Sequence, residues 1–189
     1  MIDVKGLIGG TSAFGIISND KEKGSLSHAY LIITPDKRFL GEYLKIFAEL
    51  IICQNGHACG KCRNCKLVDS NTHPDVFFYP ESDGAVVTED VNNIISESYI
   101  KPIEAPTKIF VIKGAENMTV QAQNKLLKTL EEPPSNTCIL IGATNSYQLL
   151  PTLKSRVKKL EIPAFSHERL FEALKDECPD ADKLHLAVS

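Results

Sequence analysis

Four cysteines form the clearest chemical pattern in the sequence: Cys53, Cys59, Cys62 and Cys65. Their spacing is C-x5-C-x2-C-x2-C, and four thiolates at such spacings can surround a Zn²⁺ ion tetrahedrally. A site with four protein ligands has no open position for a substrate, so it stabilises a fold and does not catalyse a reaction. The sequence therefore predicts a structural zinc knuckle at residues 53–65.

The residues around the cluster fit this prediction. Gly56 and Gly60 can form tight turns, and three nearby cations offset part of the negative charge of a zinc–thiolate centre: Lys61, Arg63 and Lys66. Two alternatives remain open. Cys59 and Cys62 also form a C-x-x-C redox motif, which would leave the other two cysteines unexplained. His57 could replace one of the ligands, although a histidine in such a loop is more typical of a solvated side chain.

Composition and charge limit the class of protein. The chain has 189 residues, of which 43% are hydrophobic and 24% charged, which is typical of one folded domain with an extension. The net charge of −3 gives no overall positive field that would attract nucleic acid. Apolar runs are far shorter than the roughly 18 residues that span a bilayer, and the N-terminus lacks a secretory signal pattern. We therefore expect a cytoplasmic protein without a membrane partner.

The elements that must position the cysteines follow an alternating pattern. Short runs rich in apolar residues predict strands at residues 29–34, 76–79, 108–112 and 137–143, and residues 157–162 supply one more. Helical periodicity predicts a helix over residues 37–52, and Thr88 and Thr119 are candidate caps of two more helices. Alternating strands and helices are typical of an α/β fold with a largely parallel sheet covered on both faces.

Six segments, in this order, resemble one known family: SHAYLIITPDKRFLGEYLKIFAELIIC (27–53), the cysteine knuckle, NTHPDV (71–76), KIFVIKGAENM (108–118), AQNKLLKTLEEPPSNTCILIGAT (122–144) and LLPTLKSRV (149–157). They are similar to the AAA+ clamp-loader subunits of bacterial DNA polymerase III, and the similarity extends from about Ser27 to Pro163. The resemblance implies an AAA+ P-loop-type parallel sheet flanked by helices, with the zinc knuckle inserted after the first of these helices.

The resemblance also implies a second domain after the sheet. Pro163 and Ala164 look like a boundary, and Ser166 can cap a new amphipathic helix that contains Leu170, Phe171 and Leu174. We therefore expect an AAA+ domain at residues 1–163 and the beginning of a helical lid domain at residues 164–189. Residues 181–188 look like the start of another helix that has no partner in the sequence, so we expect the lid domain to be truncated.

Residue chemistry separates the two kinds of zinc-bearing member of this family, the ATPase subunit (gamma/tau) and a non-hydrolysing subunit. A P-loop needs Gly, Gly, Lys and Ser or Thr at four positions, and the aligned residues here are Thr34, Phe39, Leu40 and Gly41. The Asp-Glu pair that would bind Mg²⁺ at the end of the next nucleotide-site strand is replaced by Lys113 and Gly114. The sequence therefore predicts no nucleotide bound in cis and no intrinsic ATPase activity.

One catalytic element is retained. In this family, the arginine of an S-R element projects into the ATP site of the neighbouring subunit, and here that residue is Arg156, followed by Val157 where a cysteine is usual. A guanidinium can stabilise the negative charge of the phosphoryl group during transfer. Thr144 and Asn145 match the family's sensor position, although they would also serve as turn residues.

The implied function is that of a structural subunit of the DNA polymerase III holoenzyme. Its expected direct partners are the ATPase subunit (gamma/tau) and the delta subunit, and it would reach the sliding clamp and primed DNA through the complex. Two alternatives remain: an active ATPase subunit, and an autonomous zinc-dependent nucleic-acid-binding module. For the second, the sequence offers one dense basic run, formed by Lys154, Arg156, Lys158 and Lys159.

Overall fold

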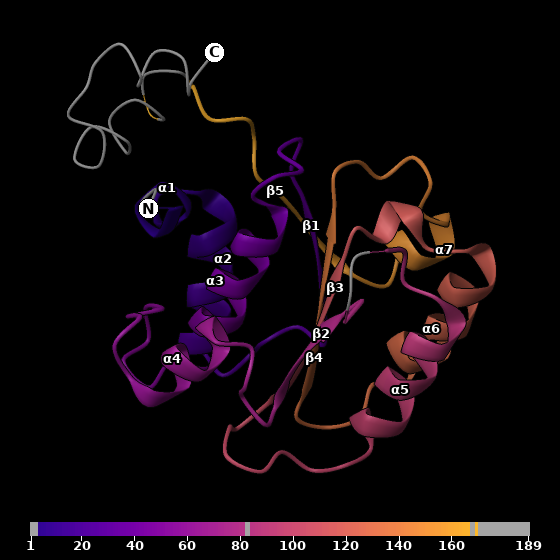
Figure 1. The fold of residues 1–189 in the computed structure, drawn as a ribbon, viewed down its shortest axis with the longest axis horizontal. Coiled ribbons are helices and arrows are strands. Elements are labelled where there is room, and N and C mark those ends of the chain that lie inside the picture. The colour runs from indigo at the N-terminus through magenta and orange to yellow at the C-terminus, as the bar shows by residue number, and fades with distance from the viewer. Residues whose placement is uncertain (1–3, 82–83, 167–168, 170–189) are drawn as a thin grey trace.

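The apolar runs of the sequence form a five-stranded parallel sheet (Figure 1). The structure is a computed structural model and describes residues 4–81, 84–166 and 169. Its strands are β1 (Ala29–Ile33), β2 (Val76–Tyr79), β3 (Lys108–Lys113), β4 (Thr137–Ala143) and β5 (Lys158–Glu161), in the spatial order β2-β3-β4-β1-β5. All pairings are parallel, which confirms the predicted α/β class and all five predicted strands.

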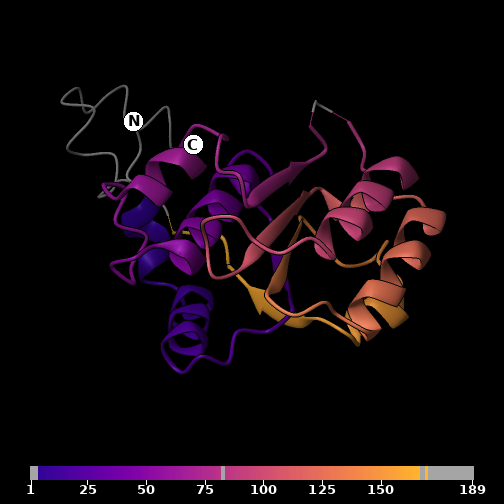
Figure 2. The same cartoon turned by 90° about the horizontal axis from the view of Figure 1, so that it is seen from below.

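Helices cover both faces of this sheet (Figures 1 and 2). One face carries α1 (Val4–Gly9), α2 (Ser12–Glu22), α3 (Leu40–Ile52) and α4 (Arg63–Asp69), and the other carries α5 (Thr88–Ser98), α6 (Val120–Glu131) and α7 (Pro151–Lys154). A short 3-10 turn, η1 (Ala115–Asn117), follows β3. Along β1, Tyr30 and Ile32 belong to one core while Ala29 and Leu31 belong to the other. A strand buried on both faces needs a continuous apolar run, which is what the sequence has.

Helix α3 lies unusually close to the centre of the sheet because β4 contains Gly142. A Cβ atom at this position would lie 2.5 Å from Leu44 Cδ1 and 3.0 Å from Leu40 Cδ1. A larger residue would have to displace these buried leucine side chains and would disturb the packing of α3 on β4. The glycine therefore fixes where the first turn of α3 lies relative to the ends of β1 and β3.

Two helix starts differ from the sequence prediction. The helix predicted from residue 37 begins at Leu40, because Asp36 Oδ1 accepts the backbone N–H groups of Arg38 and Phe39 and holds this segment in a turn. Thr88 is the first residue of α5 and not its cap; instead, Asp90 Oδ2 accepts the N–H of Val87. The Thr119 cap of α6 is confirmed, since its hydroxyl oxygen accepts the N–H of Ala122 at 3.2 Å.

The predicted boundary near Pro163 lies at the edge of the described chain. Ser166 Oγ accepts the backbone N–H of Arg169 at 3.3 Å, which is the contact expected of a helix cap. The remaining predictions for that helix, which concern Leu170, Phe171 and Leu174, lie outside the described residues, as does Cys178. No helix in the described part of the chain is long and apolar enough to cross a membrane.

A buried carboxylate fixes the loop that leads into β3. Asp75, which precedes β2, is fully buried, and its two oxygens accept the backbone N–H groups of residues 103, 104 and 105 at 2.6, 2.7 and 2.8 Å. Burial raises the pKa of Asp75, but these backbone hydrogen bonds outweigh burial and hold the pKa below its usual value. The ionised form of Asp75 therefore stabilises the fold.

Replacing Asp75 by asparagine should lower the free energy of unfolding at pH 7 by about 2 kcal/mol, because hydrogen bonds to a charged acceptor weaken. The folded-state pKa is depressed, so this stabilisation is complete above about pH 4 and is lost as the pH falls through the folded pKa. Urea unfolding should thus give a difference between the wild type and Asp75→Asn that shrinks on acidification. The exposed residue Asp69 provides the control, since Asp69→Asn should change stability by less than about 0.5 kcal/mol. A difference that is constant with pH would contradict this account.

Candidate functional site

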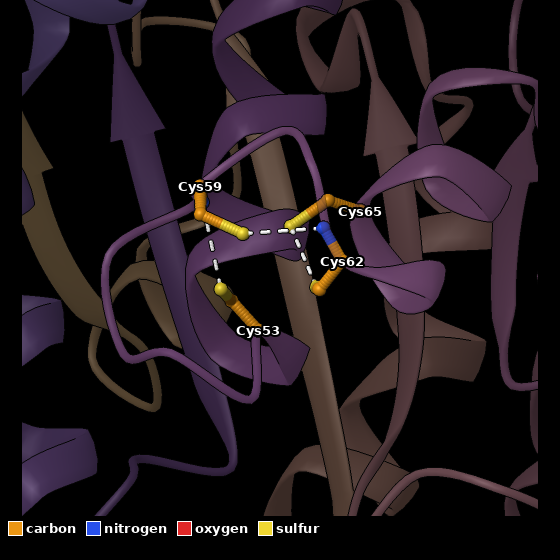
Figure 3. A group of neighbouring side chains, drawn as sticks. All are labelled: Cys53, Cys59, Cys62 and Cys65. Atoms are coloured by element: carbon orange, nitrogen blue, oxygen red, sulfur yellow. Dashed lines mark hydrogen bonds between the residues drawn. The ribbon is translucent and has the colours of Figure 1, made fainter.

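The four cysteines come together where α3 ends and α4 begins (Figure 3). Cys53 is the C-terminal cap of α3, Cys62 is the N-terminal cap of α4, and Cys65 lies in the first turn of α4. The four Sγ atoms all lie within 4.8 Å of one another. A tetrahedral zinc centre with bonds of about 2.3 Å needs sulfurs about 3.8 Å apart, so the donor set fits a Zn²⁺ ion. His57 is outside this group; its Nδ1 lies 2.7 Å from the carbonyl of Asn55.

Backbone N–H groups already favour thiolates in this cluster. The N–H groups of Cys62 and Lys61 lower the pKa of the Cys59 thiol to about 5. Burial raises the pKa of the Cys53 thiol, but hydrogen bonds from backbone N–H groups outweigh burial and lower this pKa below its usual value. At Cys65, in contrast, burial raises the pKa of the thiol well above its usual value. A bound cation would therefore favour the ionised form of Cys65 against the effect of burial.

The cations that face the cluster come from the first two helices. Lys21 of α2 donates to the carbonyl oxygens of Leu50 and Cys53 at 2.8 and 2.6 Å, and its ammonium is attracted by the thiolates. Lys5 of α1 is paired with the buried carboxylate of Glu49 at 2.6 Å and interacts with Cys65. Of the three cations expected from sequence proximity, Arg63 is paired with Glu104 instead. Lys5 and Lys21 were missed because they lie far from the four cysteines along the chain, so nothing in the sequence indicated that they face the cluster.

In the segment aligned with a P-loop, residues 34–41, several backbone donors are already used within the chain. Asp36 accepts the N–H groups of Arg38 and Phe39, which are the kind of donors that would otherwise face a phosphate. Leu40, the first residue of α3, is buried in the core, and Phe39 packs against the same core. Thr34 is also buried, and its N–H is bonded to the carbonyl of Ala143 in β4.

Lys113, which replaces an acidic residue of the ATPase subunits, lies directly against the segment aligned with the P-loop. A Cβ atom at Gly41 would lie 3.5 Å from Lys113 Cδ and 3.6 Å from Lys113 Nζ. The Lys113 side chain thus covers the first turn of α3, at the position where a P-loop serine or threonine and its Mg²⁺ would meet. A cavity of about 560 Å³ remains beside it, lined in part by Lys37, Lys113, Gly114 and Glu116.

The residues at the sensor position have partners within the chain. Thr144 Oγ1 donates to Glu116 Oε1 at 2.7 Å, and Asn145 Nδ2 donates to Thr144 Oγ1 at 3.4 Å. Gln123 of α6 holds the loop that follows, because its amide nitrogen donates to the carbonyl of Gln148 and its oxygen accepts the N–H of Leu150. These contacts position α7, the helix that leads to Arg156.

Arg156 lies in the turn after α7, away from the cavity beside Lys113. Its Nη1 donates to the carbonyl of Thr152 at 2.8 Å, and its Nη2 is 2.7 Å from Glu131 Oε1. The side chain remains one-third exposed. It borders an open hollow of about 630 Å³, lined also by His28, Leu130 and Val157. A guanidinium in this position can reach a second molecule.

The basic run around Arg156 does not form a free positive patch. Lys158 is paired with Asp20 at 2.6 Å, and Lys159 with Glu161 at 2.6 Å. Lys154 donates to the carbonyl of Ser146 at 3.2 Å. Because Lys158 and Lys159 are each paired with a carboxylate, part of the positive charge of the run is compensated within the chain, which weakens its attraction for a phosphate backbone.

Comparison with known proteins identifies the family. A family model described as "DNA polymerase III, delta subunit" matches residues 10–166, which is most of the chain. The chain belongs to this DNA polymerase III family. The delta-prime subunit of DNA polymerase III from Pseudomonas aeruginosa is 35% identical over 175 residues, covering 86% of this chain and 52% of that protein. This confirms the predicted resemblance to clamp-loader subunits. The similarity to delta-prime subunits places the chain in the delta-prime branch of this family.

Solved structures agree with this assignment at the level of the fold. A DNA polymerase III gamma subunit-related protein from Thermotoga maritima superimposes with a TM-score of 0.72 at 23% identity, covering 94% of this chain and 53% of that one. The RuvB Holliday junction branch migration motor of the same organism gives a TM-score of 0.55 at 15% identity, covering 96% and 52%. The predicted AAA+ type of sheet is confirmed. The chain spans about half the length of the curated relatives that it matches.

Proposed function

We propose that this chain acts in the DNA polymerase III clamp loader as a subunit that does not hydrolyse ATP and that presents Arg156 to the ATP site of a neighbouring subunit. The observation that carries the first part is the contact between Lys113 and Gly41. An ammonium at the Mg²⁺ position repels the metal ion and occupies its space. Asp36 also holds the N–H groups of residues 38 and 39, so a triphosphate would find neither these two donors nor its metal ion.

The second part rests on the chemistry and exposure of Arg156. During phosphoryl transfer, negative charge spreads over the oxygens of the transferred group, and a planar guanidinium can bind two of these oxygens at once. Arg156 is held at the surface beside an open hollow, and the remnant of a nucleotide site in its own chain lies elsewhere. The arginine therefore acts in trans. The proposed neighbour is the gamma/tau ATPase subunit, with the delta subunit as a further partner and the clamp and primed DNA reached through the complex.

The proposed cofactor is one zinc ion held by Cys53, Cys59, Cys62 and Cys65. When bound, it supplies a positive charge and four bonds that cross-link the end of α3 to α4, and it takes no part in a reaction. The redox alternative is less well supported, because all four sulfurs and not one pair of them converge. The domain division at residue 163 remains part of the proposal.

Equilibrium dialysis of the chain against labelled ATP and Mg²⁺ separates this function from an active ATPase. We expect no binding at millimolar nucleotide, with a gamma/tau subunit as the positive control. A dissociation constant below about 1 mM for Mg-ATP, which corresponds to about −4 kcal/mol, would contradict the proposal.

A gel-shift titration with primed DNA tests the nucleic-acid-binding alternative. The pairing of Lys158 and Lys159 with carboxylates of the same chain leads us to expect no shift by the isolated chain at physiological salt. A shift that weakens steeply with salt would favour the autonomous binding module instead.

A further inference from the structure

The backbone of Arg156 is fixed at both of its polar groups. Its N–H donates to the carbonyl of Leu153 at 3.1 Å. Its carbonyl oxygen lies 3.0 Å from Nε2 of His28, which directly precedes β1. A carbonyl oxygen only accepts hydrogen bonds, so the proton of this contact is on Nε2 of His28. His28 is itself tied to the sheet, because its carbonyl accepts the N–H of Ile139 in β4.

The guanidinium is held by two further elements. Nη1 donates to the carbonyl of Thr152 at the end of α7, and Nη2 is paired with Glu131 at the end of α6. The contact with Thr152 is favourable in itself, since a cation satisfies a terminal carbonyl of a helix. No hydrogen bond within the described residues uses the Nε–H of Arg156, so this edge of the guanidinium is available to another molecule.

Glu131 occupies a position in its helix that is electrostatically unfavourable for a carboxylate. It is the last residue of α6, where the helix dipole disfavours a carboxylate. Its side chain is half exposed, so no core packing explains its presence. Glu132 follows it with the same charge and, in the described part of the chain, has no ion pair. The observation that distinguishes Glu131 from Glu132 is the 2.7 Å contact with Arg156.

We propose that Glu131 and His28 are positioning residues for Arg156. His28 fixes where the backbone lies, and Glu131 selects one orientation of a long side chain that would otherwise sample many rotamers. A finger that is already oriented loses little freedom when it meets the charge of the transition state, so hydrolysis at the neighbouring site is faster. This inference rests on the proposed in-trans role of Arg156 and names the residues by which this chain supports it.

The experiment uses a clamp loader reconstituted from the protein that contains this chain together with its gamma/tau and delta subunits. Single-turnover hydrolysis of ATP is measured for Glu131→Ala, Glu131→Gln and the matched control Glu132→Gln. We expect Glu131→Ala to slow hydrolysis at the neighbouring subunit's site by about tenfold. The guanidinium of Arg156 would still supply its charge, but it would no longer be held in one orientation. The apparent KM for ATP should be unchanged in Glu131→Ala. Glu131→Gln should restore part of the rate, because its amide oxygen can still accept a hydrogen bond from Arg156. Glu132→Gln should match the wild type.

His28 gives a second, independent measurement. His28→Asn keeps a donor for the carbonyl of Arg156 and should retain more of the rate than His28→Ala, with thermal unfolding of each isolated chain as the check on folding. The same substitutions in an Arg156→Ala background should have no further effect on the rate, because both residues act through Arg156.

The outcomes separate this inference from the proposed function. If Arg156→Ala slows hydrolysis but Glu131→Ala matches the wild type or exceeds it, the positioning role is wrong and the finger remains. An equal loss from Glu131→Ala with and without Arg156 would also overturn it, because the residue would then be merely structural. If Arg156→Ala has no effect, the proposed function fails and the positioning role with it.

Discussion

Replacement of Arg156 by alanine is expected to slow ATP hydrolysis at the neighbouring subunit's site by about 10³-fold, the lower range found for arginine fingers. The reason is that the guanidinium acts on charge that develops in the transition state and contributes little to binding of the ground state. The affinity of that site for ATP should therefore change little. Single-turnover hydrolysis in the reconstituted clamp loader measures the effect. ATP sites that receive an arginine from other subunits should keep their own rates, so the slowed site appears as a separate kinetic phase.

Two variants make this expectation specific. Arg156→Lys keeps the positive charge but loses the planar fork, so it should recover only a small part of the rate. Lys159→Ala removes a cation from the same basic run, where Lys159 is paired with Glu161, and should leave the rate unchanged. Equal losses in Lys159→Ala and Arg156→Ala would indicate a general effect of charge. An unchanged rate in Arg156→Ala would remove this residue from catalysis.

Loss of the proposed zinc ion should have the largest effect on stability. Cys65 is fully buried, and burial holds its thiol neutral unless a cation is present. Cys65→Ala should therefore abolish stoichiometric zinc and lower the free energy of unfolding by more than about 4 kcal/mol, as loss of a structural metal does. Metal analysis gives the first result, and urea unfolding with and without a chelator gives the second. The chelator should destabilise the wild type and have no further effect on Cys65→Ala.

Cys138 supplies the control for this experiment. It is buried in β4, outside the cluster, and Cys138→Ala removes one sulfur without touching the knuckle. We expect a normal zinc content and a loss of about 1 kcal/mol, which is typical of removing a small buried group. Purified wild type that contains no zinc, and that a chelator leaves equally stable, would contradict a metal site.

Much of the fold could be predicted because the three central strands, β1, β3 and β4, are buried on both faces and appear as short continuous apolar runs. The edge strand β5 is largely exposed, and its prediction depended on its place in the alternating order of strands and helices. Helices α1 and α2 could not be predicted, since the segment from Gly6 to Gly15 is rich in glycine and lacks a clear apolar face. The start of α3 was misplaced because Asp36 competes for the backbone donors, and periodicity does not register a side-chain acceptor.

The candidate site was predictable where chemistry depends on spacing along the chain. The four cysteines are close in sequence, and their convergence is confirmed. Lys5, Lys21, His28 and Glu131 were missed because each meets its partner through the fold and not through sequence proximity. The lysine at position 113 was recognised as an altered residue, but its packing over Gly41 depends on α3 lying close to the sheet, which the sequence did not reveal.

The packing of Lys113 over Gly41 has a consequence for any attempt to give this chain an ATPase activity. Changing one position alone does not restore the site. A serine at 41 would only come into van der Waals contact with the Lys113 side chain and would leave its ammonium in place, and an aspartate at 113 would find no hydroxyl opposite it. Asp36 would still hold the amides that a phosphate requires. Each of these single substitutions is therefore without benefit, so an ATPase activity in this chain would require several changes at once.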